Sequence, residues 1–235
     1  MTERPILFSA PMVRAILEGR KVQTRRPVKP QPGDAQWIEE CAGGGWMVVE
    51  DGQPTCASGV WDTRERAYQR HISFPYTPGM RLWVRETHWM DRRDPTMVAM
   101  DLDGYVVARS GYETGQACDV AQLSKHEFWR KRPSIHMPRW ASRILLEVTA
   151  VRVERLQDIS EADAIAEGVE RVVIGEGWRR YCDYEIVGVP PCITARESFG
   201  ALWEQINGPG SWGTNPRSWG ANPWVWVVEF RRVEP

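Results

Sequence analysis

The chain has 235 residues, a formal net charge of −1 and thirteen tryptophans. This length suits one large domain or two small ones, and 42% apolar with 26% charged residues is typical of a globular protein, not a disordered one. Apolar runs are too short for a transmembrane helix and no signal peptide is visible, so we expect a cytoplasmic protein with no membrane contact. The near-zero net charge excludes a uniformly basic nucleic-acid-binding protein.

The cysteines and histidines show none of the spacings that are typical of metal sites. Five cysteines are present, no two of them have C-x-x-C spacing, and the four histidines form no H-E-x-x-H motif. The glycine motifs of P-loop and dinucleotide-binding proteins and the G-x-S-x-G motif of hydrolases are also missing from the sequence. We therefore expect no metal site and no cofactor.

The N-terminal residues predict a strand followed by a short helix. Residues 5–8 form an apolar strand candidate, and Ser9 with Pro11 is a typical helix start. Apolar residues spaced on one helical face follow, and Gly19 marks the end. This pattern predicts a helix over residues 10–18.

Two segments are strongly basic although the whole chain is not. Residues 14–29 carry six basic residues and one acidic residue, and residues 125–143 have the same balance, so each segment has a charge of +5. The remaining residues must then total −11. Segregated charge of this kind indicates either a local basic surface or simply a solvated basic stretch.

The rest of the chain predicts an α+β protein. Residues 30–79 are rich in Gly and Pro, with weak strand signals at 46–49 and 72–74, and residues 110–124 look like a loop. Capping-box patterns at Ser160 and Thr194 predict two further helices. Strands are expected over 80–87, 105–108, 143–156 and 224–233. Together these elements predict a small, partly closed β-barrel of about five or six strands with short flanking helices and long loop insertions.

One motif resembles a known family. The sequence Gly19-Arg-Lys-Val-Gln-Thr-Arg-Arg26, directly after the first helix, resembles the start of the ASCH domain, a relative of the PUA fold. Pro78-Gly-Met-Arg-Leu-Trp-Val84 is similar to the P-G-D-x-L-x-V strand of that family, with Met80 where the family usually has Asp. The resemblance, closest to the long ASCH proteins of phages and prophages, implies one domain over 1–235 with insertions at about 30–77, 88–142 and 170–223.

The resemblance also implies an activity. One branch of the superfamily is a bacterial amidohydrolase that removes the acetyl group of N4-acetylcytidine with a Lys, a Thr and a Glu, and Lys21, Thr24 and Glu167 are the matching positions here. Thr24 would be the nucleophile, Lys21 its activating base and Glu167 the acid/base partner. Residues three apart on an ideal strand face opposite sides, so Lys21 and Thr24 can converge only if Lys21 lies on a turn or a bulge intervenes.

A second hypothesis is a non-catalytic RNA- or DNA-binding module of phage or prophage origin. The two basic segments and the excess of aromatic residues motivate it. The best candidates for exposed aromatics that stack on bases lie in a duplicated loop, in which Ser211–Pro216 and Ser218–Pro223 each contain Ser-Trp-Gly-x-Asn-Pro. Candidate substrate- or nucleic-acid-binding residues are Arg20, Arg25, Arg26, Arg85, Glu86, Trp212 and Trp219.

Two of these features have alternative interpretations that the sequence leaves open. Arg85 and Glu86 can form a cross-strand ion pair instead of lining a pocket, and the repeated loop can be rigid and packed. The expected partner is a modified nucleoside, RNA or single-stranded DNA. The sequence does not decide between these partners, and it does not indicate an oligomeric state.

Overall fold

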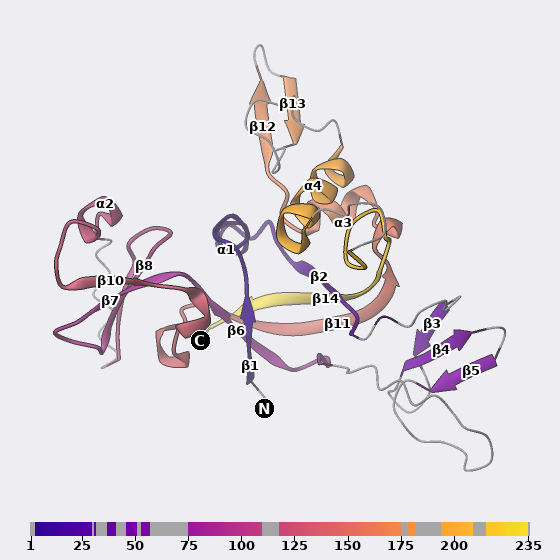
Figure 1. Ribbon diagram of the computed structural model, residues 1–235, viewed down its shortest axis with the longest axis horizontal. Coiled ribbons are helices and arrows are strands. Elements are labelled where there is room, and N and C mark those ends of the chain that lie inside the picture. The colour runs from indigo at the N-terminus through magenta and orange to yellow at the C-terminus, as the bar shows by residue number, and fades with distance from the viewer. Residues whose placement is uncertain are drawn as a thin grey trace. The chain divides into compact units, whose positions relative to one another are not determined.

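The computed structural model describes residues 3–29, 31, 37–40, 46–50, 53–56, 75–109, 118–174, 178–181, 194–208 and 215–234. Within these ranges the protein is a mixed α+β structure (Figure 1). No helix among the described residues has the length and apolar character needed to cross a membrane.

The chain divides into two compact units, each assembled from separate stretches of sequence. Unit 1 comprises Met1–Arg20, Pro78–Thr149 and Phe230–Pro235, and unit 2 comprises Lys21–Thr77 and Ala150–Glu229. The basic segment 14–29 therefore begins in unit 1 and ends in unit 2, whereas the basic segment 125–143 lies entirely in unit 1. The single domain expected from the family resemblance stays a prediction.

Unit 1 contains a helix, two small sets of strands and a four-residue helix. Its elements are β1 (Glu3–Leu7), α1 (Ala10–Leu17), β6 (Arg81–Arg85), β7 (His88–Asp91), β8 (Met97–Met100), β9 (Val106–Ala108), α2 (Val120–Leu123), β10 (Trp129–Arg132) and the first residues of β11 (Leu145–Arg155). Strand β1 runs parallel to β6, and β6 pairs antiparallel with β11. Buried Leu82, Val84 and Leu146 form part of this core.

Unit 2 carries the second half of β11 and the C-terminal helices. Its other elements are β2 (Gln23–Pro27), β3 (Trp37–Glu40), β4 (Trp46–Glu50), β5 (Gln53–Cys56), α3 (Glu161–Ala166), β12 (Arg171–Ile174), β13 (Trp178–Tyr181), α4 (Ala195–Asn207) and most of β14 (Trp224–Val233). Strand β14 pairs antiparallel with β2, with Val227 opposite Arg25. Phe199, Trp203 and Trp226 are buried in this unit.

The largest sheet has the hydrogen-bonded order β1-β6-β11-β14-β2, and it has two ends. No strand pairing in the described ranges joins β1 to β2, so the sheet does not close there. The expected barrel therefore stays a prediction, whereas the α+β class is confirmed.

The predicted helix ends are confirmed by hydrogen bonds. Helix α1 ends in a Schellman motif: Gly19 N–H donates to the Ile16 carbonyl, and Arg20 N–H donates to the Ala15 carbonyl. Gly19 has φ = +74°, a left-handed conformation that costs a glycine little. Ser9 occupies the N-cap of α1 as predicted, but its hydroxyl makes no capping hydrogen bond.

The segments expected as insertions contain regular structure that the sequence pattern did not predict. Residues 88–142 include a four-stranded antiparallel sheet of order β10-β7-β8-β9, in which β9 matches the strand expected at 105–108 and the other three strands were not expected. Apolar clusters surround Met100 and Leu123. Helix α2 lies where a loop was expected, because Asp119 caps its first turn by accepting from Ala121 N–H. Residues 72–74, expected as a weak strand, lie outside the described residues.

Candidate functional site

Lys21 and Glu167 meet in the interior of unit 2. The Lys21 ammonium donates to Glu167 Oε2 at 2.7 Å and to the Glu167 backbone carbonyl at 2.8 Å. The two side chains are only 2% and 3% exposed. Two of the three residues that the family resemblance placed together are thus in direct contact.

The backbone explains why these two residues meet although they are far apart in sequence. Glu167 is the C-cap of α3, where helix carbonyls lack intrahelical partners. Val22 N–H donates to the Ala166 carbonyl at 3.0 Å, so the segment before β2 runs against the end of α3. A lysine at a helix C-terminus is also favoured by the helix dipole, which gives the Lys21 contact a structural role in addition to any chemistry.

Arg25 lies beside this pair and is completely buried. Its guanidinium contacts Glu167 Oε1 at 3.1 Å and Asp163 Oδ2 at 3.5 Å, and its Nε donates to Glu154 Oε1 at 3.0 Å. The side-chain exposure of Arg25 is 0%, and its guanidinium neutralises three carboxylates. Its role in binding a substrate or a nucleic acid stays a prediction.

Arg152 extends the cluster toward solvent. It contacts Glu154 at 3.2 Å and Asp163 at 3.1 Å, and it also pairs with Glu229 on β14. The sequence analysis did not find Arg152, Glu154 or Asp163 as members of a charge cluster. Asp163 was visible only as part of a capping box, and nothing in the local pattern connects it with Arg25, 138 residues earlier.

Thr24 lies on β2 between two residues that contact α3, Gln23 and Arg25. Gln23 donates to the Asp163 carbonyl and Arg25 contacts Asp163, so both neighbours of Thr24 face α3. Side chains alternate along a strand, which places the buried Thr24 hydroxyl on the other face. The structure brings Lys21 and Glu167 together with Arg25, and the place of Thr24 in this site stays a prediction.

The burial of Lys21 favours its neutral form. Desolvation lowers the pKa of the Lys21 amine below the ordinary 10.5, the Glu167 carboxylate partly offsets this effect, and Arg26 and Arg25 add to the lowering. A lysine with a lowered pKa can accept a proton from a nucleophile at a lower pH than an exposed lysine can.

The other predicted basic residues lie in varied surroundings. Arg20 is half-buried and contacts Glu18 at 2.5 Å, and Arg26 is half-buried on β2, opposite Trp226 in the pairing with β14. Arg85 in unit 1 lies over the Trp83 ring, with its guanidinium carbon 4.7 Å from the ring centroid. These contacts hold the three arginine side chains in place. The roles of these arginines in binding stay predictions.

Glu86 pairs with an arginine other than its neighbour. Its carboxylate accepts from Arg143 Nε at 3.1 Å and Arg143 Nη2 at 2.8 Å, a bidentate arrangement. Glu86 therefore forms an ion pair, but its partner is Arg143 and not Arg85. Glu86 also lines a cavity of about 370 Å³ in unit 1, together with Ser9, Thr87 and Asp101.

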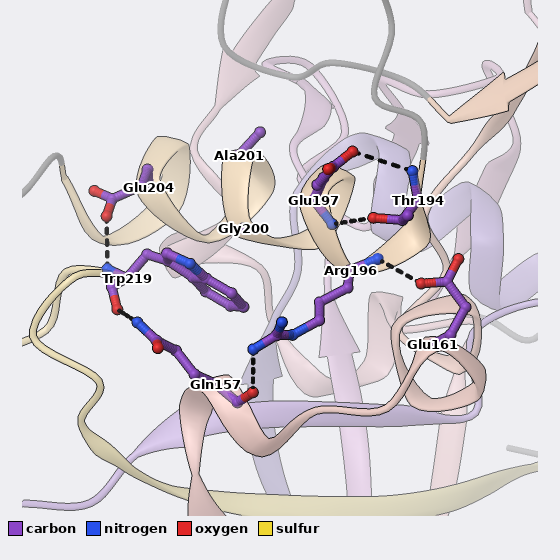
Figure 2. A pocket seen from close by; sticks show the side chains of 9 residues that line it. All are labelled: Gln157, Glu161, Thr194, Arg196, Glu197, Gly200, Ala201, Glu204 and Trp219. Carbon is purple, nitrogen blue, oxygen red and sulfur yellow. Dashed lines mark hydrogen bonds between the residues drawn. The ribbon is translucent and has the colours of Figure 1, made fainter.

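The two tryptophans of the duplicated loop differ in what the structure shows. Trp212 lies outside the described residues. Trp219 is half-buried in unit 2 and lines a cavity of about 710 Å³ (Figure 2). Trp224 and Trp226 on β14 are 5% and 2% exposed.

Within the described ranges, no group of three or more His, Cys, Asp or Glu side chains is arranged to hold a metal ion. The acidic residues around Arg25 are instead neutralised by arginine and lysine.

The fold and site together define a mixed α+β protein with a buried lysine–glutamate pair inside a larger charge cluster. Comparisons with protein-family models, with curated proteins and with solved structures each found no match to this chain. The resemblance to the ASCH domain accordingly rests on sequence motifs, such as those at residues 19–26 and 78–84.

Proposed function

We propose that this chain is an ASCH-type amidohydrolase that removes an acyl group from the N4 position of a cytidine base, with Lys21 and Glu167 as its acid–base pair. The observation that carries the proposal is the 2.7 Å contact between these two side chains, both almost fully buried. The lysine stands at the position where the resembling hydrolases have their catalytic lysine, and its partner is the glutamate expected from the same resemblance.

The chemistry requires a nucleophile, a proton acceptor and a proton donor. The neutral Lys21 amine takes the proton of the nucleophile as that nucleophile attacks the acyl carbonyl carbon. The C–N bond then breaks, and the base nitrogen leaves as an amine after it receives a proton from the Lys21–Glu167 pair. Water completes the reaction, so one N-acylated base and one water give one free amino base and one carboxylic acid.

The resemblance assigns the nucleophile to the Thr24 hydroxyl. A threonine hydroxyl needs an adjacent base, and β2 directs Thr24 away from the face where Gln23 and Arg25 contact α3. Replacing Thr24 by valine tests this role, because valine keeps the side-chain volume and removes the hydroxyl. Full activity in Thr24→Val would make water the nucleophile and would leave the Lys21–Glu167 assignment in place.

Incubation with N4-acetylcytidine tests the proposal itself. We expect cytidine and acetate to appear in equal amounts, measured by chromatography and by an enzymatic acetate assay. Unchanged N4-acetylcytidine after prolonged incubation with the folded wild-type protein would overturn the proposal.

The pH dependence of hydrolysis should report the Lys21 amine. The rate should rise with pH through the pKa of Lys21, because only the neutral amine accepts a proton, and that pKa is below the ordinary 10.5. Glu167→Gln removes the negative charge that raises this pKa, so the rising limb should move to lower pH. A plot of kcat/KM against pH for both proteins measures the shift.

Glu154→Gln is the matched control for this experiment. Glu154 contacts Arg25 and Arg152, and the contacts that hold Lys21 go to Glu167. The rising limb should therefore stay near its wild-type position in Glu154→Gln. A limb that does not move in Glu167→Gln, or that moves equally in both variants, contradicts the assignment of the limb to Lys21.

A second candidate function, nucleic-acid binding, is favoured by one feature of unit 1. Strand β10 is an edge strand, and its last three residues, Arg130, Lys131 and Arg132, are all exposed. Lys131 is paired with Asp101 at 2.8 Å, so Arg130 and Arg132 are the stronger candidates for phosphate contacts. Basic residues also protect exposed sheet edges from aggregation, which is the structural alternative.

Charge removal on β10 distinguishes these two roles. If β10 binds phosphates, Arg130→Gln together with Arg132→Gln should weaken binding of single-stranded RNA or DNA and reduce the slope of log K against log salt by about 1 to 2. Lys125→Gln is the matched control, because Lys125 is exposed in the same basic segment but lies outside β10. Fluorescence anisotropy at several salt concentrations measures both quantities, and equal losses in the two proteins would rule out a specific role for β10.

A further inference from the structure

A cavity of about 710 Å³ in unit 2 has a composition unlike that of the Lys21–Glu167 site. It lies along α4 and the start of α3, and it has one aromatic wall (Figure 2). Glu161, in the first turn of α3, lines it, whereas Glu167 caps the other end of that helix. Six residues at 1.5 Å per residue separate these positions by about 9 Å along the helix axis, so the cavity is a separate site.

The aromatic wall is the Trp219 indole, which is held in place on several sides. A Cβ added to Gly200 would lie 3.3 Å from Trp219 Cε2, so only the small glycine lets the indole pack this closely on α4. The Phe199 ring meets it edge-on, with centroids 6.2 Å apart. The Trp219 backbone N–H donates to Glu204 at 2.6 Å, and its carbonyl accepts from Gln157 at 2.8 Å. The ring is therefore held in a fixed position at the wall of the cavity.

The polar lining is mostly acidic and is held in place by the fold. Glu161 accepts from the backbone N–H groups of Ala195 and Arg196 at 2.6 Å and 3.1 Å, and Glu197 forms the capping box of α4 with Thr194. The single lining cation, Arg196, donates to the Gln157 carbonyl at 2.6 Å, and its guanidinium lies 5.9 Å from the Trp219 ring centroid. The lining residues therefore include three carboxylates, those of Glu161, Glu197 and Glu204, and one guanidinium.

The excess of negative charge in the cavity lining disfavours ligands that carry a phosphate and favours ligands that carry hydrogen-bond donors. A phosphate brought into the cavity would be repelled by the excess negative charge, whereas carboxylates accept hydrogen bonds from amino groups. A flat aromatic surface binds the face of a planar heterocycle, and such stacking depends little on the identity of the base. Charge and shape together describe a ligand that is planar, carries an amino group and lacks a phosphate.

We propose that the Trp219 cavity binds an uncharged amino-bearing nucleobase or nucleoside, with the ring stacked on Trp219 and its amino group donating to the lining carboxylates. The inference goes beyond the proposed function, because this site is separate from Lys21 and does not depend on hydrolysis. Cytidine and adenosine fit the description. Uridine lacks the amino group, and cytidine monophosphate carries the excluded charge.

Calorimetric titration of the full chain with these four compounds tests the proposal. Cytidine and adenosine should bind, and uridine and cytidine monophosphate should bind at least about fivefold more weakly at low salt. Trp219→Ala should weaken cytidine binding by about tenfold or more. Ile206→Ala is the matched control, because Ile206 is exposed on the same helix but does not line the cavity, and this variant should bind as the wild type does.

Glu197→Gln keeps the test independent of any folding defect in Trp219→Ala. Glutamine at this position preserves a capping box and removes one negative charge, so cytidine monophosphate should gain affinity several-fold relative to cytidine. Lys21→Met should bind cytidine normally even though it loses hydrolysis, which separates failure of this inference from failure of the proposed function. No binding by the wild type, equal binding of cytidine and its monophosphate, or unchanged binding in Trp219→Ala would overturn the inference.

Discussion

Replacing Lys21 by methionine should reduce hydrolysis of N4-acetylcytidine by about 10²- to 10⁴-fold, the range expected when a general base is removed. Methionine fills a similar volume without an amine. Glu167 keeps its contact with Arg25 at 3.1 Å in this variant, so the carboxylate is not left without a positive partner. Initial rates of cytidine release, together with the denaturation midpoint, separate the chemical effect from a loss of fold.

A second variant, Lys21→Arg, separates the effect of the positive charge at position 21 from the effect of proton transfer. Arginine preserves the positive charge and hydrogen-bond donors next to Glu167, but its guanidinium remains protonated and cannot serve as a base. We expect this variant to be folded and inactive. Substantial activity in Lys21→Arg would show that the positive charge, and not proton transfer, is what position 21 contributes.

Replacing Arg25 by methionine should give the largest loss of stability, about 3 to 5 kcal/mol in the free energy of unfolding. The Arg25 side chain is fully buried, and three carboxylates converge on it. Removing the guanidinium leaves those carboxylates with less neutralising charge in a region that excludes water. Urea denaturation followed by circular dichroism measures the change as a shift of the midpoint at constant slope.

Arg152→Met is the control for Arg25→Met. Arg152 also contacts three carboxylates, but its side chain is 36% exposed. Solvent screens its ion pairs, so its replacement should cost about 1 kcal/mol or less. Equal losses of stability in the two variants would contradict a buried Arg25 at the centre of the charge cluster.

The elements that the sequence predicted correctly are those with strong local signals. Helices α1, α3 and α4 were expected from their caps and apolar periodicity, and α4 has both hydrogen bonds of its predicted capping box. Strand β14 coincides with the expected range because it opens with five consecutive bulky apolar residues, Trp224–Val228. Local rules suffice for such segments because the signal lies within a few residues.

The missed elements have short ranges or depend on distant partners. Helix α2 is only four residues long, and β7, β8 and β10 are four-residue strands in a segment without clear periodicity. Their sheet exists because each strand pairs with another, and pairing cannot be read from one strand alone. The same reason explains why a barrel was expected although the described pairings leave the main sheet open.

In the candidate site, too, some residues could be predicted from a local motif and others depend on distant partners. The family motif located Lys21 and Glu167, whose contact joins residues 146 positions apart. The burial of Arg25 could not be predicted, because a run of basic residues looks alike whether it is solvated or neutralised by buried acids. The carboxylates that bury Arg25 come from β11 and α3, and no local pattern connects them with β2.

The measurement that tests the central claim most directly is the comparison of N4-acetylcytidine with N4-methylcytidine as substrates of the wild-type protein. Both carry a substituent on the same nitrogen, but only the first has an amide carbonyl for a nucleophile to attack. We predict that cytidine is released from N4-acetylcytidine at a rate that depends on Lys21, and that N4-methylcytidine is left intact. Release of cytidine from neither compound by the folded protein would contradict the assignment of Lys21 and Glu167 as an amide-hydrolysing pair.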